Sequence, residues 1–334
     1  MVSLAPDVDS RSAVGKLPLA WGLALVAVAA ALWGADGIFR RGLALELPAA
    51  TVVFWEHVIL VLVTIPALQR GIASARRLGA REWVYLILIG AGASATATAL
   101  FTAAFRYGDP STPLLLQKLQ PLVAIVAARI LLQERLRPRF SLFLVAGLAG
   151  AWLIAFSDPT EVAVGATKVA LLAIGAAVLW GMGTVLGRHM TAHLPSQEIT
   201  ALRFAIGLPA AGALAVIDGG TGSLAIGFGD VDALILLALV PGLLALSIYY
   251  RGLRSTPASL ATLAELAFPV SAITLNYAFF DTTLTGTQWL GVAVLSATLV
   301  TMSYTARSAG SRALGVDAPG VLRPGDADPQ PASS

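Results

Sequence analysis

The chain has 334 residues, of which 57% are hydrophobic and only 12% are charged, and its formal net charge is +3. Charged residues make up about 25% of an average soluble domain, so this composition, with a mean hydropathy of +0.80, excludes a soluble globular fold and indicates an integral membrane protein. The small positive charge needs no nucleic-acid partner to explain it, and the absence of cysteine excludes disulfides and cysteine-ligated metals.

An internal repeat divides the chain into two similar halves. Residues 32–48 and 179–195 carry the same pattern, in which Leu-Trp-Gly is followed by an arginine and then a proline at the same spacing. Residues 106–121 and 254–269 form a second matching pair, each opening with arginine and closing with proline. Such self-similarity indicates two copies of one structural unit.

Apolar segments long enough to cross a bilayer recur along both halves. A transmembrane helix needs roughly 20 apolar residues, and such segments start near residues 18, 48, 83, 110, 139, 167, 195, 232, 256 and 285. The sequence therefore predicts an all-α integral membrane protein with ten transmembrane helices, five in a repeat over 18–158 and five in a repeat over 167–306. Because five is odd, the second copy enters the membrane from the opposite side, so the repeats are inverted, as in many secondary transporters.

Basic residues predict the orientation. The amino terminus, the tail and the loops near residues 70–81, 135–139, 188 and 251–254 hold 15 arginines and lysines, whereas the alternate loops hold 4. By the positive-inside rule, both termini are cytoplasmic.

The two ends of the chain lie outside the repeats. Residues 1–17 are expected to form a cytoplasmic segment. The first apolar run follows Arg11 and Lys16 as the core of a signal peptide would, but its counterpart in the second repeat indicates that it is retained. Residues 307–334 are rich in Pro, Asp, Gly and Ser, so we expect a disordered cytoplasmic tail.

The most specific motifs surround the predicted fourth helix. Residues 106–113 read Arg-Tyr-Gly-Asp-Pro-Ser-Thr-Pro and residues 119–121 read Leu-Gln-Pro. Residues 133–136 then read Gln-Glu-Arg-Leu, ahead of a fifth helix that contains Gly147 and Gly150.

The second half keeps a looser version of these motifs, with Arg-Ser-Thr-Pro at 254–257, Phe-Pro at 268–269 and Gly291, but with Asp-Thr-Thr-Leu at 281–284 in place of Glu-Arg-Leu. On these motifs and the Leu-Trp-Gly of the first helix, each half resembles an EamA domain of the drug/metabolite transporter superfamily. Within it, the chain is most similar overall to the bacterial aromatic amino acid exporters. The resemblance implies a bacterial inner-membrane transporter that exports aromatic and other apolar amino acids by alternating access.

Pro121 and Pro269 are expected near mid-membrane in the fourth and ninth helices. Each proline removes an intrahelical hydrogen bond and should kink its helix. Carbonyl groups freed at that depth are tolerated where they are buried in protein or line a water-filled cavity. We interpret the two prolines as hinges beside a cavity; the alternative is that they only shape the packing.

Ionisable residues within the predicted spans are the strongest chemical signal, because each is costly to insert and usually marks a pathway or a buried pair. Lys118 lies eight residues beyond Pro110, about 12 Å along a helix, and Glu265 lies eight beyond Pro257, at the mirror depth. Facing one cavity, Lys118 and Glu265 would match the carboxylate and ammonium of an amino acid, with Gln117 as a further candidate contact. The alternatives are a Lys118–Glu265 ion pair, or two side chains satisfied separately by neighbouring carbonyls.

A second charged pair is predicted in the second and seventh helices, where Glu56 and Arg203 occupy equivalent depths. We interpret it as a structural ion pair between the repeats. Glu56 with the adjacent His57 would carry protons if transport is proton-coupled.

Aromatic and hydroxyl side chains complete the candidate substrate site. Trp33 and Trp180 occupy matched positions within the first and sixth helices and are candidates for an aromatic wall. Thr98 and Thr102 of the third helix are further candidates, although small hydroxyls in membrane helices often bond to their own backbone. Tyr249, near the end of the eighth helix, is instead interpreted with Tyr250 as a membrane-interface anchor.

No enzyme motif stands out, and we expect neither a cofactor nor a metal. His189 and His193 have the i, i+4 spacing of metal ligands, but no third ligand lies near them in sequence. The chain has no ATP-binding module, so uphill transport would use an ion or proton gradient. We expect a monomer in the lipid bilayer with a small-molecule substrate. The alternatives are an exporter of other small metabolites or drugs and, from a different class, a membrane receptor or scaffold.

Overall fold

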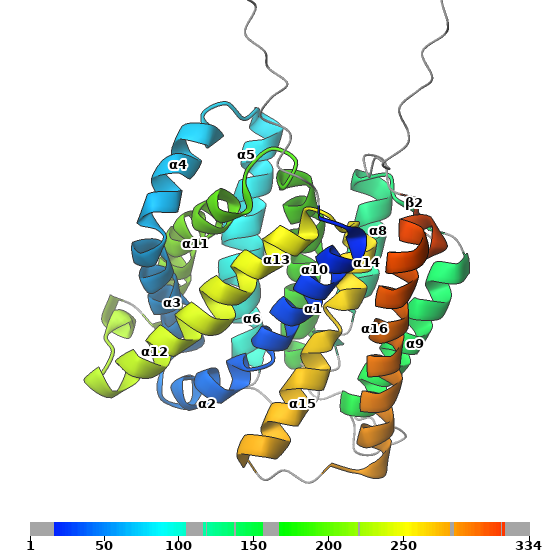
Figure 1. Ribbon diagram of the computed structural model, residues 1–334. Helices are drawn as coiled ribbons and strands as arrows, with labels where there is room; N and C mark the ends of the chain where they lie inside the picture. Colours follow the sequence, from blue (N-terminus) through cyan, green and yellow to red (C-terminus); the bar gives the residue numbers. More distant parts are fainter. Residues whose placement is uncertain are drawn as a thin grey trace, which may run out of the picture.

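The structure, a computed structural model, forms a bundle of helices (Figure 1). It describes residues 17–104, 116–117, 119–136, 138–155, 167–219, 221–280, 284–314 and 316–317. Within these ranges, two short strands form the sheet structure: β1 (Arg135–Leu136) pairs antiparallel with β2 (Val316–Asp317). Helices dominate because a backbone inside a bilayer must satisfy its own hydrogen bonds.

The first half of the chain begins with α1 and ends with α9. Its helices are α1 (Leu19–Trp33), α2 (Asp36–Glu46), α3 (Ala49–Val63), α4 (Ile65–Ala75), α5 (Ala80–Ile87), the π-helix η2 (Leu88–Thr96), α6 (Ala97–Ala104), α8 (Gln120–Leu131) and α9 (Pro138–Ala155).

The second half begins with α10 and ends with α16. Its helices are α10 (Thr167–Met190), α11 (Ser196–Gly219), the 3₁₀-helices η3 (Thr221–Leu224) and η4 (Phe228–Asp230), α12 (Val231–Leu237), the π-helix η5 (Ala238–Leu244), α13 (Ala245–Leu253), α14 (Ala258–Ala264), α15 (Ala267–Phe280) and α16 (Gly286–Ala313).

Seven stretches of the described chain are long and apolar enough to cross a membrane: Leu19–Arg40, Ala80–Ala104, Thr167–Met190, Ser196–Gly219, Val231–Leu253, Ala258–Leu275 and Gly286–Arg307. The bent pair α3 and α4 is an eighth candidate. Two shorter apolar helices, Gln120–Leu131 and Pro138–Ile154, occupy the positions of the fourth and fifth predicted spans. The all-α, multi-pass membrane architecture is thus confirmed, whereas the ten-span inverted arrangement stays a prediction.

The bend between α3 and α4 measures 84° and has a local cause. At the junction the Thr64 hydroxyl donates to the Leu60 carbonyl oxygen at 2.6 Å, a type of contact that often bends helices. Pro66 follows in the first turn of α4, where its missing N–H is tolerated.

The two π-helices occupy corresponding places in the two halves. The segment η2 joins α5 to α6, and η5 joins α12 to α13. Pro241 lies within η5, where it cannot donate to the helix ladder. The internal repeat seen in the sequence therefore extends to an unusual backbone feature, since π-helical turns are rare.

Helices of one half pack on helices of the other in a reciprocal way. In the first half, α3 and α9 pack against their second-half counterparts, α11 and α16 respectively, and α8 packs against α14. The first helix of each half also crosses over, because α1 packs against α13 and α15 while α10 packs against α6 and α8. Two units related by a two-fold axis are expected to pack in this manner.

In Figure 1 the start of α1 and the end of α16 lie at the same, upper side of the bundle. The end of α15 and the start of α16 lie at the lower side.

Glycines allow the closest approaches between the halves. A Cβ on Gly291 of α16 would lie 2.8 Å from the Gly150 carbonyl oxygen of α9, and one on Gly252 would lie 2.7 Å from the Gly22 carbonyl oxygen. Real Cβ atoms essentially never lie this close to another atom, so both positions require glycine, which has no side chain. Close backbone approach at small residues is typical of membrane helix interfaces.

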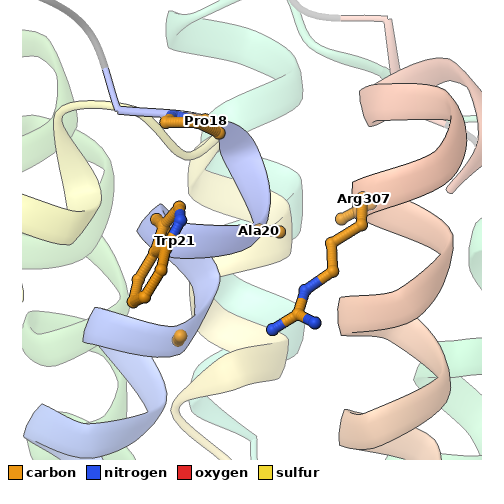
Figure 2. Close-up of a pocket in the computed structure, with 6 residues that line it drawn as sticks. Pro18, Ala20, Trp21 and Arg307 are labelled. Carbon is orange, nitrogen blue, oxygen red and sulfur yellow. The ribbon is translucent and has the colours of Figure 1, made fainter.

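A shallow cavity of about 230 Å³ opens on the outer surface between α1 and α16 (Figure 2). Its lining comprises Pro18, Ala20, Trp21, Ala24, Ala306 and Arg307. Trp21 is 62% exposed, which suits an aromatic side chain in contact with lipid.

Candidate substrate site

Glu265 lies at a break within the predicted ninth transmembrane helix, between α14 and α15. Pro269 causes the break, because it has no N–H to donate to the carbonyl group of Glu265, four residues earlier. The Phe268 N–H donates to that carbonyl instead, at 3.0 Å, in a tighter turn. In the first half, Pro121 follows the residue at which α8 begins, and Gln117 lies four residues before it, as Glu265 does before Pro269.

The Glu265 carboxyl group accepts hydrogen bonds from three neutral side chains. Tyr249 Oη donates at 2.8 Å and Thr184 Oγ1 at 3.1 Å to Oε1, and Gln120 Nε2 donates at 2.7 Å to Oε2. Glu265, Thr184 and Tyr249 are all buried. No described residue forms an ion pair with Glu265, so a carboxyl group with neutral partners lies inside a predicted span, where such groups usually serve function.

Three helices from the two halves, together with the break between α14 and α15, supply this cluster. Gln120 comes from α8 in the first half, whereas Thr184 comes from α10 and Tyr249 from α13. Because α8 and α14 pack against each other, a first-half amide reaches the second-half carboxyl group. The cluster therefore lies where the two halves meet.

Aromatic rings flank the carboxyl cluster. The Trp33 ring lies against the Tyr249 ring, with centroids 5.1 Å apart. Trp180 packs edge-on against Phe101, also at 5.1 Å, one helical turn before Thr184 on α10. The structure thus joins Trp33 to the Glu265 cluster through Tyr249, whereas the described contact of Trp180 is with α6.

The glycines of the repeated Leu-Trp-Gly motif have matching roles. A Cβ on Gly34 would meet the Ser271 hydroxyl and would lie 2.8 Å from the Ala272 nitrogen of α15. A Cβ on Gly181 would lie 3.0 Å from the Gln120 carbonyl oxygen of α8. Each glycine thus lets its helix approach the proline-broken helix of the other half.

The remaining predicted substrate residues are placed differently. Lys118 lies outside the described residues. Gln117 Oε1 is buried and has no hydrogen-bond partner among the residues that the structure describes. Thr102 is buried and donates to the Thr98 carbonyl oxygen at 2.8 Å, the backbone contact that was the alternative to a substrate role.

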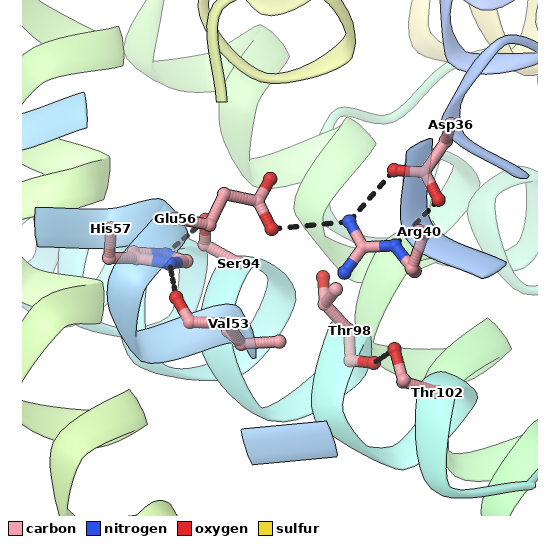
Figure 3. Close-up of polar contacts among 8 residues, drawn as sticks. All are labelled: Asp36, Arg40, Val53, Glu56, His57, Ser94, Thr98 and Thr102. Carbon is pink, nitrogen blue, oxygen red and sulfur yellow. Dashed lines mark hydrogen bonds and ion pairs between the residues drawn. The ribbon is translucent and has the colours of Figure 1, made fainter. Parts of the chain in front are cut away.

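The predicted Glu56–Arg203 ion pair needs correction, because each side chain has other partners; those of Glu56 are drawn in Figure 3. Glu56 pairs with Arg40 Nη2 at 3.1 Å. Arg40 is also held by Asp36, with Nε at 2.6 Å and Nη2 at 2.7 Å from the two carboxylate oxygens. Asp36 and Arg40 stand i, i+4 on α2, a spacing that favours such a pair and could have identified it from the sequence.

Arg203 instead bridges two other elements. Its guanidinium donates to Tyr250 Oη and to the Ala93 carbonyl oxygen, each at 3.2 Å. Ala93 lies in η2, where the widened π-turn leaves a carbonyl group accessible. Tyr249 and Tyr250 are 3% and 0% exposed, so they are core residues and not the interface anchors that their place near a helix end suggested.

His57 makes two buried contacts beside Glu56 (Figure 3). Its Nδ1 lies 2.8 Å from the Val53 carbonyl oxygen, which can only accept, so Nδ1 carries the proton. Its Nε2 lies 3.0 Å from the Ser94 hydroxyl and is then the acceptor. Both ring nitrogens are occupied, and neither contact is with Glu56.

Glu134 links the two halves by hydrogen bonds at another point. Its carboxylate accepts the Ala258 N–H at 2.8 Å and the Ser259 N–H at 3.1 Å, together with the Ser259 hydroxyl. These N–H groups belong to the first turn of α14, which has no other N-terminal cap. The sequence identified Glu134 as part of a motif, and the structure shows that it caps the start of α14.

Three comparisons relate the chain to known proteins. The EamA-like transporter family matches residues 20–156 and 167–304. A riboflavin transporter of Rhizobium johnstonii is 30% identical over 90% of this chain and 94% of its own length. The riboflavin transporter ImpX of Fusobacterium nucleatum is 27% identical over 84% of this chain and 97% of its own.

Further likeness is found in sequence and in structure. An uncharacterized transporter of Bacillus subtilis, YwfM, is 26% identical over 84% of this chain and 93% of its own. A solved crystal structure has a TM-score of 0.68 at 22% identity and covers 85% of this chain and 97% of the solved chain. At that identity the likeness shows the fold alone.

Proposed function

We propose, on the premise that the chain belongs to the EamA-like transporter family, that it carries riboflavin or a chemically similar planar metabolite across the membrane. The Glu265 cluster is proposed as the place where the substrate binds. The observation that carries this proposal is the buried Glu265 carboxyl group, which has only neutral donors among the described residues.

The chemistry of the cluster suits such a substrate. Riboflavin is uncharged at neutral pH and presents a flat ring system, ring N–H and carbonyl groups, and a chain of hydroxyls. Trp33 and Tyr249 offer aromatic faces for the ring, while Glu265 and Gln120 offer a hydrogen-bond acceptor and donor. A neutral molecule needs no cationic partner at the site.

The substrate named in the two riboflavin transporters described above differs from the amino acids that the resemblance implied. An amino acid would require a cation for its carboxylate, the role proposed for Lys118. Amino acid export, with Lys118 and Glu265 as the two charged contacts, is therefore the alternative function. A transport experiment must include amino acids to test it.

Access to the cluster requires motion, because Glu265 is buried in the conformation described. We propose that α8 and α15 move at their proline-bearing starts, with Pro121 and Pro269 as hinges. The breaks in hydrogen bonding at these points lower the cost of bending. Such motion would expose the cluster to one side of the membrane at a time.

Transport by purified protein in liposomes tests the proposal. Vesicles would be assayed with labelled riboflavin, tryptophan, phenylalanine and two cationic drugs, with protein-free vesicles as the control. We expect saturable riboflavin flux that unlabelled riboflavin suppresses and tryptophan does not. Flux of tryptophan without flux of riboflavin would contradict the flavin proposal and restore amino acids as the substrate.

A further inference from the structure

A second group of functional side chains lies away from the Glu265 cluster, at the ends of two helices. Glu82 lies in the first turn of α5, His189 in the last turn of α10, and His193 just beyond it. One ligand atom of each residue lies within 4.8 Å of the others. We propose that Glu82, His189 and His193 bind a divalent transition-metal ion of the zinc type.

The two histidines present lone pairs that nothing else in the described chain uses. His189 Nε2 is buried and has no hydrogen-bond partner among the described residues. His193 Nδ1 lies 3.2 Å from the His189 carbonyl oxygen, which can only accept, so His193 Nε2 is free to bind a metal. A ligating histidine usually donates its other ring N–H to a carbonyl or carboxylate in this way.

The distance between the Glu82 carboxylate and His189 is close to that between two ligands of one zinc ion. Glu82 Oε1 lies 3.6 Å from His189 Nε2, too far for a hydrogen bond. Zinc–ligand bonds of about 2.0–2.1 Å at tetrahedral angles place two ligands roughly 3.3 Å apart. A shift of a few tenths of an ångström brings both onto one ion, and the exposed His193 ring can turn to complete the site.

Arg81 is the competitor for this carboxylate. Its Nε lies 3.2 Å from Glu82 Oε1, but the Arg81 side chain is 65% exposed. An exposed ion pair contributes little to stability, so Arg81 can move into solvent when a metal binds. Without an ion, the stacked rings of His189 and His193, 4.6 Å apart, lie beside the Glu82 carboxylate, whose ion-pair partners in the described chain are the exposed Arg81 and, when protonated, His189.

The donor set selects the type of metal. Two imidazoles with one carboxylate suit zinc and its neighbours in the transition series, whereas magnesium and calcium prefer oxygen ligands. With three protein ligands, a zinc ion keeps a fourth position for water. The spacing of His189 and His193 is visible in the sequence, but the third ligand is not, because Glu82 comes from a distant segment and only the packing of α5 on α10 brings it in.

Binding would join the two halves of the protein. Glu82 belongs to the first matched segment and the histidines to the second, and α5 would be tied to the end of α10. An ion that binds the folded arrangement stabilises it by mass action. The metal site would thus hold these two helix ends together, independently of the substrate proposed above.

Zinc binding to the tag-free, full-length protein in detergent tests the inference. Calorimetry should give one zinc per chain, and cobalt in its place should give the visible absorption of a tetrahedral site. The variants Glu82→Gln, His189→Gln and His193→Gln should each weaken binding by roughly tenfold or more, since even outer-sphere partners of a metal account for 10- to 100-fold. The control Glu46→Gln removes an exposed carboxylate elsewhere and should leave binding unchanged, and magnesium should not compete.

Two results would overturn the inference. The first is zinc binding that the Glu82→Gln variant retains at full strength, which would reduce the site to a histidine pair. The second is the absence of saturable zinc binding in the unchanged protein. His193 is exposed, so a melting temperature of His193→Gln that matches the unchanged protein without metal separates loss of a ligand from loss of folding.

Discussion

Single side chains decide the chemistry of the substrate site. Glu265 accepts from Gln120, Thr184 and Tyr249, so it orders three helices as well as offering an acceptor to a substrate. The two roles can be separated, because a glutamine keeps a carbonyl oxygen for Tyr249 and Thr184 while removing the carboxylate.

We expect Glu265→Gln to fold and to bind substrate roughly tenfold to 150-fold more weakly. A hydrogen bond to a charged group is worth about 1.5–3 kcal/mol, and about 1.4 kcal/mol corresponds to a factor of ten. Substrate affinity and protein yield would be measured together. The comparison variant Tyr249→Phe keeps the carboxylate and loses one donor.

The double variant Lys118→Met, Glu265→Gln tests whether Lys118 and Glu265 form an ion pair with each other. If they do, each single change leaves an unpaired buried charge and lowers yield, whereas the double variant recovers yield and transport. We expect no such recovery of transport, since Glu265 is proposed to contact the substrate. A double variant with normal transport would remove Glu265 from the site.

At the scale of helices, the repeated Leu-Trp-Gly motif is explained by contact between the halves. We expect Gly34→Ala and Gly181→Ala each to destabilise the protein by about 1–3 kcal/mol, the usual cost of overpacking. Thermal unfolding in detergent would measure this. Gly42 has open space around its Cα, so Gly42→Ala in α2 should be neutral or slightly stabilising, and equal effects at all three positions would argue against the packing role.

The proline breaks give a second prediction for helices. Pro121→Ala and Pro269→Ala restore a backbone donor without touching the side chains of the Glu265 cluster. We expect folded protein, slower transport and little change in substrate affinity. Transport at the normal rate in the double variant would show that the prolines only shape the helices.

For the whole molecule, the distribution of basic residues predicts sidedness. Single cysteines are simple to place in a chain that has none. Cysteines at the exposed positions Ala73 and Ala192 should react with an impermeant reagent only from the cytoplasmic side, and those at Gly222 and Gly286 only from the opposite side. Reaction of all four from one side would refute the inverted repeat.

Repetition and hydropathy were sufficient to predict the all-helical membrane fold. The cost of inserting a charge made Glu265 a candidate, and its substrate role stays a proposal. The partners of Glu265 could not be predicted, because Gln120 is 145 residues away in sequence and meets it only through packing of α8 on α14. Tyr249 was wrongly interpreted as a membrane-interface anchor, because its position near a helix end does not tell whether its side chain faces lipid or protein. Glu56 was given the wrong partner because equivalent depth does not specify direction around a helix.

The two π-helical turns let their helices lose one residue without turning the rest of the helix. A π-turn holds one more residue than an α-turn, so deleting one residue from η2 would let it relax into an α-helix while Thr98 and Thr102 keep their neighbours. The same deletion in an α-helical part of the span would rotate everything beyond it by about 100°, the angle of one residue in a helix of 3.6 per turn. Related chains should therefore accept the loss of a single residue in η2 or η5 far more readily than in the α-helices that flank them.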